Sequence, residues 1–372
     1  MVNYDRKRGK TGAVLALLMV MLVTTSILAT ETQRVVCKIG CEYSTIGAAI
    51  GSAEPGDEII IEQGTYEENL AIDINLTLSG TDRGKVTIKS DMDGRPTITV
   101  GPQDIEVAVR KLTVTGSRGV PADTEAKEFP DGLLVRGRAR LTLSDVIISG
   151  NEACGVRLTA DSTLETANSS FSYNGNACCG TDRSRIDIRD TRISGNGIVL
   201  SDSSSGHIMD STISNHNNRG LVLEDESSVT VRNGKVGTCE TCIQLINNSS
   251  IRIVNSKVEE AGDGIKLLDI STAEIIGSEV AGSTSGIDMQ DKTRVEVRNS
   301  RITKNDHGIS LFGFSELHLE NCRIAYNDIG LRSNPGSGVK VSGCGIRFYN
   351  NFEDHTRGLA KRIEESLQDR CS

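Results

Sequence analysis

The stretch "GIKLLDISTAEIIGSEVAGSTSGIDMQDKTRVEVRNSRITKNDHGISL", Gly264 to Leu311, repeats one short pattern three times. A glycine is followed by alternating apolar and polar residues, and the glycines lie 22 residues apart. The same pattern begins at the following further positions: Gly132, Gly155, Gly197, Gly220, Cys242 and Gly330. Self-similarity at a fixed period of this size indicates a solenoid, in which each repeat stacks on the next.

Other positions keep the same 22-residue register. Two apolar columns run through the C-terminal half: Ile253, Ile275, Val297, Leu319 and Val341, and then Val258, Val280, Ile302, Ile324 and Ile346. Between them lie two further columns: Asn255, Gly277, Asn299, Asn321 and Gly343, followed by Ser256, Ser278, Ser300, Cys322 and Cys344. Short strands that stack in parallel about 4.8 Å apart would place like residues on like residues. Asn and Gly suit corners with left-handed backbone angles. We therefore predict an all-β fold, a single-stranded parallel β-helix of about 12 coils, and not a leucine-rich repeat, whose leucine and asparagine framework is missing.

The two ends of the chain differ from the repeats. Residues 1–29 combine a basic segment with a 17-residue apolar run from Ala13, which predicts a secretory signal peptide or an uncleaved N-terminal anchor. We expect the β-helix over residues 30–355. Residues 356–372 predict an amphipathic helix that caps the last coil, with Leu359, Ile363 and Leu367 on one face. At the N-terminal end, Ser44 is the expected N-cap of a capping helix with this apolar face: Ile46, Ala49, Ile50 and Ala53.

Charge and cysteine content restrict the partners and the compartment. The formal net charge is −9, and residues 1–29 contribute +3, which leaves −12 for the rest of the chain. A body this acidic disfavours nucleic acid, and it repels polyanionic polysaccharides unless a local basic stripe or bound cations intervene. All ten cysteines follow the apolar run, as expected for an oxidising compartment. Cys37 with Cys41 and Cys239 with Cys242 are candidate disulfides; the second pair is a single CxxC without a partner pair nearby, which favours a disulfide over a zinc site. Cys322 and Cys344 are either a disulfide or two small apolar fillers.

The segment "YSTIGAAIGSAEPGDEIIIEQGTYEENLAIDINLTLSG", residues 43–80, resembles the opening of right-handed β-helix proteins of the pectate-lyase and pectinesterase type. In that family a helix caps the solenoid, a "PGD" turn leads into the first strand, and "GTYxEN" closes the first coil. With the later coils, the resemblance covers roughly residues 40–350. The repeats also resemble exported β-helix proteins linked to copper-enzyme maturation, and carbohydrate-binding and sugar-hydrolase modules. The resemblance implies a right-handed β-helix and a polysaccharide ligand, but no catalytic motif of the family is present; "NDHG" is the nearest match to a polygalacturonase motif, with Asp306 in place of a glycine.

The outward positions of the strand after the corner glycine are the candidate site. They are Arg157, Val199, Val222, Gln244, Lys266, Asp288, Ser310 and Arg332. With the corner residues Asp263 and His307, they place this group on one edge over four coils: Asp263, Lys266, Asp288, His307 and Arg332. Two carboxylates could act as acid and base, a cation could neutralise a uronate, and a histidine could move a proton. The simpler interpretation is an exposed ion pair between Lys266 and Asp288 beside a solvated corner histidine.

Three functions remain open at this stage. We expect an exported binding or scaffold module, secreted, periplasmic or at the cell surface, monomeric, with an extracellular or envelope polysaccharide as ligand. The first alternative is a polysaccharide lyase, glycoside hydrolase or epimerase, for which residues 116–132 could form a groove wall or merely a polar loop. The second is an envelope factor for metal-enzyme maturation. No cofactor is identified, although Asp269 and Asp291 stack at one phase and could bind calcium.

Overall fold

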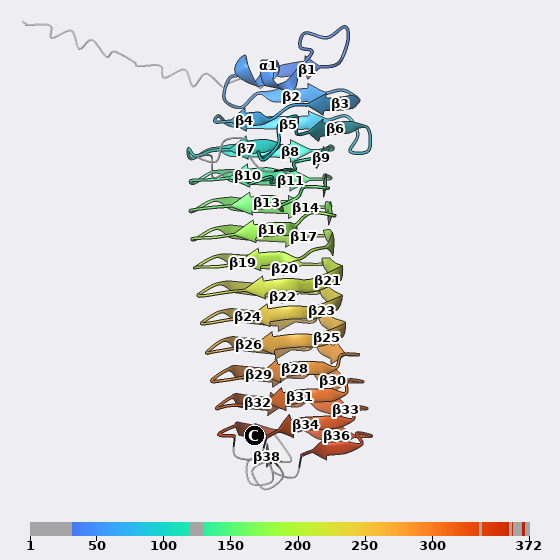
Figure 1. The fold of residues 1–372 in the computed structure, drawn as a ribbon. Coiled ribbons are helices and arrows are strands. Elements are labelled where there is room, and N and C mark those ends of the chain that lie inside the picture. The colour runs from blue at the N-terminus through green and yellow to red at the C-terminus, as the bar shows by residue number, and fades with distance from the viewer. Residues whose placement is uncertain (1–31, 120–128, 335–336, 357–358, 360–366, 369–372) are drawn as a thin grey trace, which may run out of the picture. The chain divides into compact units, whose positions relative to one another are not determined.

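A computed structural model describes residues 32–119, 129–334, 337–356, 359 and 367–368. The predicted targeting segment, residues 1–29, lies outside the described residues. From Gln33 onward the chain winds into a parallel β-solenoid of about 14 turns, somewhat more than the 12 coils expected (Figure 1). The N-terminal coils vary in length, since Thr77 pairs with Ala108, 31 residues later.

Each regular coil has three strands, which form rows a, b and c along the solenoid. Row a is a 15-stranded parallel sheet made of the following strands: β1 (Gln33–Val36), β2 (Glu58–Ile61), β5 (Leu76–Gly80), β8 (Glu106–Arg110), β11 (Arg140–Ser144), β14 (Thr163–Ala167), β17 (Arg185–Arg189), β20 (Ser205–Met209), β22 (Ser228–Arg232), β24 (Ser250–Val254), β26 (Thr272–Ile276), β29 (Arg294–Arg298), β32 (Glu316–Glu320), β35 (Lys340–Cys344) and β38 (Leu367–Gln368).

Rows b and c belong to a second sheet, in which three long strands bridge both rows. Row b comprises β3 (Gly64–Glu67), β6 (Val86–Lys89), β9 (Thr113–Thr115), β12 (Ile147–Ser149), β15 (Ser170–Ser172), β18 (Arg192–Gly195), β21 (Thr212–Leu223), β23 (Lys235–Leu245), β25 (Lys257–Leu267), β27 (Glu279–Ala281), β30 (Arg301–Thr303), β33 (Arg323–Ala325) and β36 (Arg347–Tyr349). Row c comprises β4 (Leu70–Ile72), β7 (Ile98–Val100), β10 (Leu133–Val135), β13 (Cys154–Leu158), β16 (Asn176–Gly180), β19 (Ile198–Leu200), the C-terminal halves of β21, β23 and β25, then β28 (Ser285–Met289), β31 (His307–Leu311), β34 (Ile329–Ser333) and β37 (Glu353–His355).

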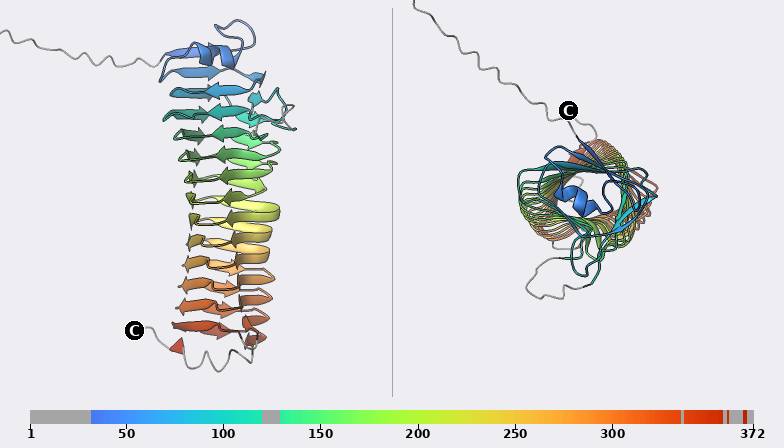
Figure 2. Two further views of the ribbon diagram at one scale, coloured as in Figure 1. Left: turned by 60° about the vertical axis from the view of Figure 1, so that its left-hand side comes forward. Right: turned by 90° about the horizontal axis from the view of Figure 1, so that it is seen from above.

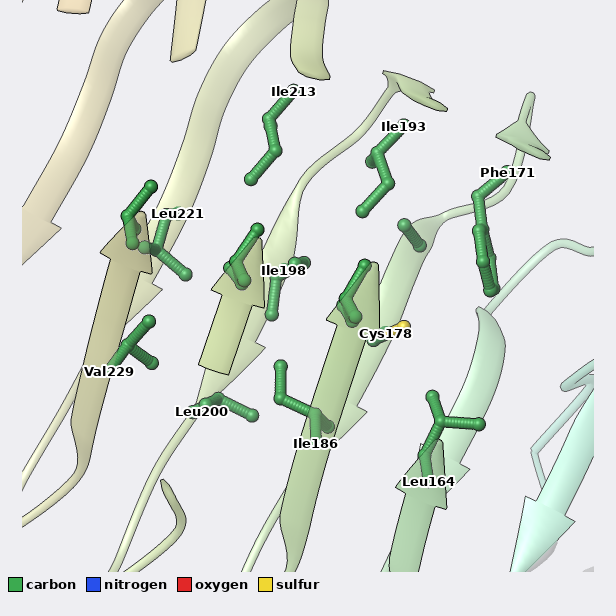
Figure 3. Packing of buried hydrophobic residues seen from close by; sticks show 14 of the residues in the cluster. Leu164, Phe171, Cys178, Ile186, Ile193, Ile198, Leu200, Ile213, Leu221 and Val229 are labelled. Atoms are coloured by element: carbon green, nitrogen blue, oxygen red, sulfur yellow. The ribbon is translucent and has the colours of Figure 1, made fainter. Parts of the chain in front are cut away.

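The core is a set of apolar columns along the solenoid interior. Alternate side chains of each strand point inward, and parallel pairing in register places each on its equivalent one coil away. Phe171, Ile193 and Ile213 follow one another in this way, all fully buried (Figure 3). The predicted columns through Ile253 and Val258 are confirmed as far as Leu319 and Ile324.

The predicted columns fail at the last coil. Leu319 pairs with Gly343 and not with Val341, and Ile324 pairs with Phe348 and not with Ile346. The reason is an insertion of two residues, since Glu316 pairs with Lys340, 24 positions later. The expected stacking of Cys322 on Cys344 is therefore wrong, and so is a disulfide between them: Cys322 is a free, buried thiol, whereas Cys344 is disulfide-bonded.

The corners between rows a and b use left-handed residues. Asn255, Asn299 and Asn321 have φ of 50–52°. The serines that follow three of these corners link the coils, as the backbone N–H of Ser256 donates to Ser278 Oγ at 3.0 Å and that of Ser278 to Ser300 Oγ at 3.0 Å. These hydrogen bonds satisfy backbone groups that the turn removes from the sheet.

The repeated glycine before row c has a different role. Gly264, Gly286 and Gly308 do not have left-handed φ. A Cβ atom on Gly264 or Gly286 would lie 2.5 Å from the carbonyl oxygen of the next glycine in the column. Close approach of the stacked backbones therefore explains why glycine repeats here.

A short helix closes the N-terminal end of the core. Helix α1 (Ile46–Gly51) lies over the middle of the coils when they are viewed along the axis (Figure 2). Its N-cap is Thr45 and not Ser44 as predicted, and the Glu68 carboxylate accepts hydrogen bonds from the backbone N–H groups of Ile46 (2.9 Å) and Gly47 (2.8 Å). Ile46 and Ala49 are buried, as the predicted apolar face requires.

At the C-terminal end, the predicted helix over residues 356–372 lies mostly outside the described residues, Ile363 included. Leu359 is buried. Leu367 belongs to strand β38, which pairs with β35, so the helix prediction is wrong at this position because the chain gains sheet hydrogen bonds there.

Three disulfides are formed between described cysteines. Cys37–Cys41 and Cys239–Cys242 confirm the two local candidates. Cys154–Cys179 joins neighbouring coils with a Cα–Cα distance of 6.0 Å, and it was not predicted because its separation of 25 residues matches no repeat step. No helix in the described part of the chain is long and apolar enough to cross a membrane.

Buried asparagines hold the corner between rows b and c in the last coils. Asn327 Oδ1 accepts hydrogen bonds from the backbone N–H (3.0 Å) and side-chain amide (3.1 Å) of Asn305. The Asn327 amide in turn donates to Ile302 O (3.1 Å) and Asn351 Oδ1 (3.0 Å). Asn327 is 2% exposed, so water cannot replace these bonds.

Substitution Asn327→Ala should therefore lower the free energy of unfolding by about 2–4 kcal/mol, because it leaves several buried polar groups unpaired. Urea titration of the full chain measures the loss. Asn248→Ala, at an exposed turn, serves as the control and should change stability by less than about 0.5 kcal/mol. If both substitutions lowered the free energy of unfolding equally, the buried hydrogen bonds of Asn327 would not have the stabilising role described here.

Candidate functional site

Row c gathers the five predicted site residues on one outward face. Lys266 pairs in register with Asp288, which pairs with Ser310, which pairs with Arg332. Three residues earlier in each coil, at the corner, Asp263 pairs with Ser285, and Ser285 with His307. The five residues thus lie on four successive coils, as the repeat predicted.

Lys266 is held between two carboxylates. Its Nζ lies 3.1 Å from Asp263 Oδ2 and 3.7 Å from Asp288 Oδ2. Burial alone lowers the pKa of Lys266, but the hydrogen bond to Asp263 and the two negative charges outweigh it, so that the pKa is raised. The ammonium group is therefore firmly protonated and its charge is compensated locally.

Asp288 is the most deeply buried member of the group. It is 7% exposed; its Oδ2 accepts a hydrogen bond from Gln290 Nε2 at 2.9 Å, and its Oδ1 is buried with no partner among the described residues. Burial raises the pKa of Asp288, assisted by the charge of Asp263 and opposed by the bond from Gln290 and the charge of Lys266. A carboxyl group in this environment tends to retain its proton.

His307 and Arg332 form a separate pair. Arg332 Nη1 lies 3.2 Å from His307 Nε2, and the Arg332 guanidinium carbon lies 5.9 Å from the centre of the Phe312 ring. Because a guanidinium has no acceptor, Nε2 of His307 must be the acceptor in this contact. Ser285 and Ser310, 3.2 Å apart through their Oγ atoms, occupy the positions between the two groups.

The described ends of the 116–132 insertion lie far from this group. Asp131 is fully buried and its Oδ2 lies 2.7 Å from Arg157 Nε, while the Arg157 guanidinium carbon lies 4.5 Å from the centre of the Phe129 ring. Burial raises the pKa of Asp131 in spite of the bond from Arg157. Arg157 and Lys266 are five coils apart in the same column, about 24 Å at the ladder spacing.

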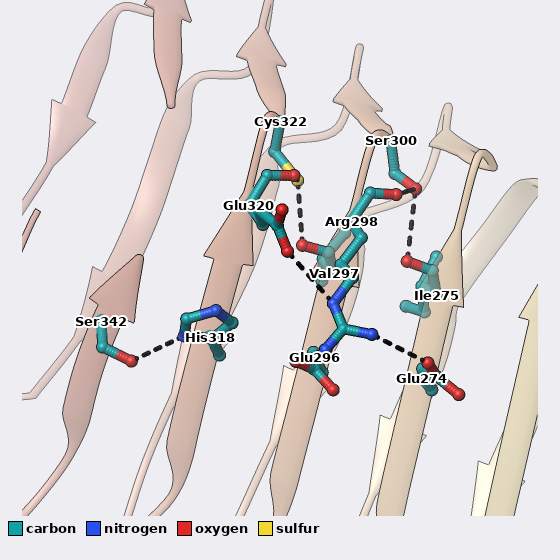
Figure 4. Close-up of polar contacts among 10 residues, drawn as sticks. All are labelled: Glu274, Ile275, Glu296, Val297, Arg298, Ser300, His318, Glu320, Cys322 and Ser342. Carbon is teal, nitrogen blue, oxygen red and sulfur yellow. Dashed lines mark hydrogen bonds and ion pairs between the residues drawn. The ribbon is translucent and has the colours of Figure 1, made fainter. Parts of the chain in front are cut away.

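The outer face of row a holds a shallow groove that the sequence did not indicate. The groove has a volume of ≈ 560 Å³, and small hydroxyl residues form its floor: Ser205, Ser228, Ser250 and Thr272. Beyond it, Arg298 lies close to three glutamates, Glu274 (3.3 Å), Glu296 (2.5 Å) and Glu320 (3.2 Å), as Figure 4 shows. The charge of Arg298 is thus compensated by more than one carboxylate.

The predicted calcium position consists of stacked turns. Asp269 and Asp291 have φ of 61° and 58°, and Asp291 Oδ2 accepts the backbone N–H of Asp269 at 3.2 Å. Within the described ranges, no group of three or more His, Cys, Asp or Glu side chains is placed to hold a metal ion. Calcium binding here stays a prediction.

Comparison with known proteins identifies the class. The profile described as "Right handed beta helix region" matches residues 126–255 and 241–354, more than half of the chain. The chain belongs to this right-handed β-helix family, which confirms the predicted fold and its resemblance to the pectate-lyase type. No curated protein matches the sequence.

Several solved structures share the fold. The periplasmic alginate epimerase AlgG has 14% identity and a TM-score of 0.54, over 79% of this chain and 76% of that one. The A-module of the mannuronan C-5 epimerase AlgE4 of Azotobacter vinelandii has 14% identity and a TM-score of 0.51, over 83% and 91%. Tailspike protein 3 of bacteriophage CBA120 has 12% identity and a TM-score of 0.58, over 87% of this chain and 58% of the tailspike. At these identities the likeness is one of fold.

The substitution Asp288→Asn should raise the free energy of unfolding at pH 7. The folded-state pKa of Asp288 is above its unfolded value, so the wild type loses stability as pH rises through the folded pKa, while the amide does not. The gain should vanish below about pH 3.9, the ordinary aspartate pKa, where both states of the wild type are protonated.

Denaturant titrations of both proteins between pH 3 and pH 8 measure this difference. Asp306→Asn, at an exposed aspartate in the turn before β31, removes the same charge and is the control; it should change stability by less than about 0.5 kcal/mol. If Asp288→Asn is less stable than the wild type at pH 7, Asp288 is held as an anion by Lys266 and the raised pKa is wrong.

Proposed function

We propose that this protein is an exported module that binds a polysaccharide along the outer face of row c without cleaving it. One observation carries the proposal: a column of polar side chains continues over five coils, Gln244, Lys266, Asp288, Ser310 and Arg332. Its step of about 4.8 Å is close to the length of one sugar residue in an extended chain. Successive sugars could therefore lie over successive coils.

The column offers donors to sugar groups at its two long cationic side chains. Lys266 and Arg332 are partly exposed and can donate, whereas Gln244, Asp288 and Ser310 are 9%, 7% and 2% exposed and form the low floor between them. Contacts with Asp263 and His307 already hold the two long cationic side chains, which reduces the entropy lost on binding. The names of the two epimerases indicate that those proteins act on alginate and mannuronan, which supports a polysaccharide as the ligand here.

The arrangement favours binding over catalysis. Asp263 and Asp288 share one lysine, and Nε2 of His307 is occupied by Arg332. These residues therefore form neither a carboxylate pair arranged as in a glycosidase nor a histidine that is free to act as a base. The described residues also hold no ligand cluster that favours a role in metal-enzyme maturation.

A catalytic alternative rests on Asp288. Its buried carboxyl group has a raised pKa and one oxygen without a partner among the described residues, which are properties of a general acid. A lyase, hydrolase or epimerase centred on Asp288 is therefore the second candidate.

Export is part of the proposal. The disulfides between described cysteines are compatible with an oxidising compartment. We propose that residues 1–29 direct the chain there, to the periplasm, the cell surface or the medium.

The double substitution Lys266→Gln with Arg332→Gln should weaken polysaccharide binding about tenfold or more, equivalent to about 1.4 kcal/mol, because it removes the two charged donors of the column. A panel of neutral and acidic polysaccharides, measured by biolayer interferometry on the full chain, provides the test. Arg138→Gln with Lys292→Gln, at exposed turns outside row c, removes the same charge and should leave binding within about twofold.

The same incubations distinguish the two candidates. We expect no new reducing ends and no unsaturated uronate absorbance. Product that forms with the wild type and disappears with Asp288→Asn would replace the binding function with the catalytic one. Wild-type protein that binds no polymer of the panel would contradict both.

A further inference from the structure

The outer face of row b carries a column of cations in an acidic protein. Outward residues pair in register in the order Lys235, Lys257, Glu279, Arg301, Arg323 and Arg347, five cations and one anion. The whole chain has a net charge of −9. Stacking at about 4.8 Å brings like charges together, which is unfavourable unless they are neutralised.

Neutralisation stops at the last coils. Lys235 and Lys257 both contact Glu259, and Arg301 Nη2 lies 3.3 Å from Glu279 Oε2. Arg323 and Arg347 form no ion pair with any described residue. Lys304, exposed at the adjoining corner, adds a further cation beside them. The C-terminal end of row b therefore has an uncompensated positive charge.

A strip of small side chains runs along the arginine column. The next outward column consists of Ala281, Thr303 and Ala325, which are small and 1–8% exposed. The arginine column borders this strip on one side, and the corner residues Lys304 and Tyr326 border it on the other. A shallow hollow of ≈ 460 Å³, lined in part by Gly277 and Arg301, lies on the far side of the arginine column. Both features give an extended ligand access to the guanidinium groups.

Two exposed tyrosines lie on the same coils. Tyr326 and Tyr349 are 48% and 51% exposed, and their ring centres are 5.6 Å apart in an edge-to-face arrangement. The Arg323 guanidinium carbon lies 5.7 Å and 5.1 Å from the two ring centres. Tyr326 has a left-handed φ of 58°, as Glu260 and Lys304 have at the same corner of earlier coils, so the corner fixes the backbone from which its ring projects.

We propose that this surface is a second polysaccharide-binding site, specific for a linear chain that carries carboxylate or sulfate groups. The basic patch is defined as Arg301, Lys304, Arg323, Tyr326, Arg347 and Tyr349. Successive anionic groups contact Arg301, Arg323 and Arg347, whose guanidinium groups match the geometry of such anions. A sugar ring packs its apolar face on the tyrosines. The site lies on row b and is independent of the row c face of the proposed function.

The direct test is the triple substitution Arg301→Gln, Arg323→Gln and Arg347→Gln in the full chain. Binding to polygalacturonate, dextran sulfate and uncharged dextran is measured at low and at moderate salt. We expect the wild type to bind one or both anionic polymers, more weakly at higher salt, and the triple variant to bind them about tenfold or more weakly. The relative affinities for polygalacturonate and dextran sulfate identify the anion.

A matched triple variant controls for net charge. Arg140→Gln, Arg183→Gln and Arg294→Gln remove the same three charges at positions outside the patch, where each arginine already has a carboxylate partner. These changes should alter binding by less than about twofold. Equal losses for both triples would overturn the proposal, and so would equal binding of dextran.

Two further measurements separate the alternatives. Tyr326→Ala with Tyr349→Ala keeps the charges, and should weaken binding of polygalacturonate or dextran sulfate about threefold to tenfold while leaving inorganic polyphosphate unaffected. Tighter binding of a DNA oligonucleotide than of either anionic polysaccharide would overturn the polysaccharide assignment. If only Lys266→Gln with Arg332→Gln abolishes binding, the patch proposal fails and the row c proposal stands; if only the patch triple does, the reverse holds.

Discussion

In-register parallel pairing between successive coils is the constraint on which the rest of the structure depends. It places each residue about 4.8 Å from its equivalent one coil away, so the kind of side chain that one position requires is required again along the whole column. Inside, the result is apolar columns such as Phe171, Ile193 and Ile213. Where a corner must bury polar backbone, the column is built from side chains that hydrogen-bond along it, as Asn305 and Asn327 do.

On the outside, the same constraint creates ladders of charge, and their neutralisation differs between faces. On row c, Lys266 is enclosed by Asp263 and Asp288, and on row a Arg298 is surrounded by glutamates. On row b, the ladder ends in Arg323 and Arg347, which have no carboxylate partner among the described residues. In such a protein, a binding face can be recognised where stacking leaves charged side chains without a partner. It can also be recognised where stacking aligns hydrogen-bonding side chains on successive coils.

The repeat in the sequence was sufficient for the fold and for the row c column, because both depend only on which residues share a phase. Asp263, Lys266, Asp288, His307 and Arg332 could be brought together in this way. The phase rule failed where coil length changes: the 24-residue step from Glu316 to Lys340 displaced the last columns, and it also hid the alignment of Arg347 with Arg323.

Other features depend on side-chain geometry that a period cannot supply. The burial of Asp288 and its bond from Gln290, the pairing of Cys154 with Cys179, and the contact of both tyrosines with Arg323 all join residues of different phase. The groove on row a could not be predicted either. Serine and threonine residues on successive coils are recognisable as its floor only when the positions of the longer side chains around them are known.

The central claim is that a sugar polymer is recognised by a ladder of coils and not by one pocket. The most direct test is the affinity of galacturonate oligomers of increasing length, measured by isothermal titration calorimetry on the full chain. We expect affinity to rise with each added sugar until the oligomer spans the four or five coils of a polar column, and then to level off. A monomer or dimer that binds as tightly as the longest oligomer, or a series in which none binds, would contradict recognition by the stacked coils.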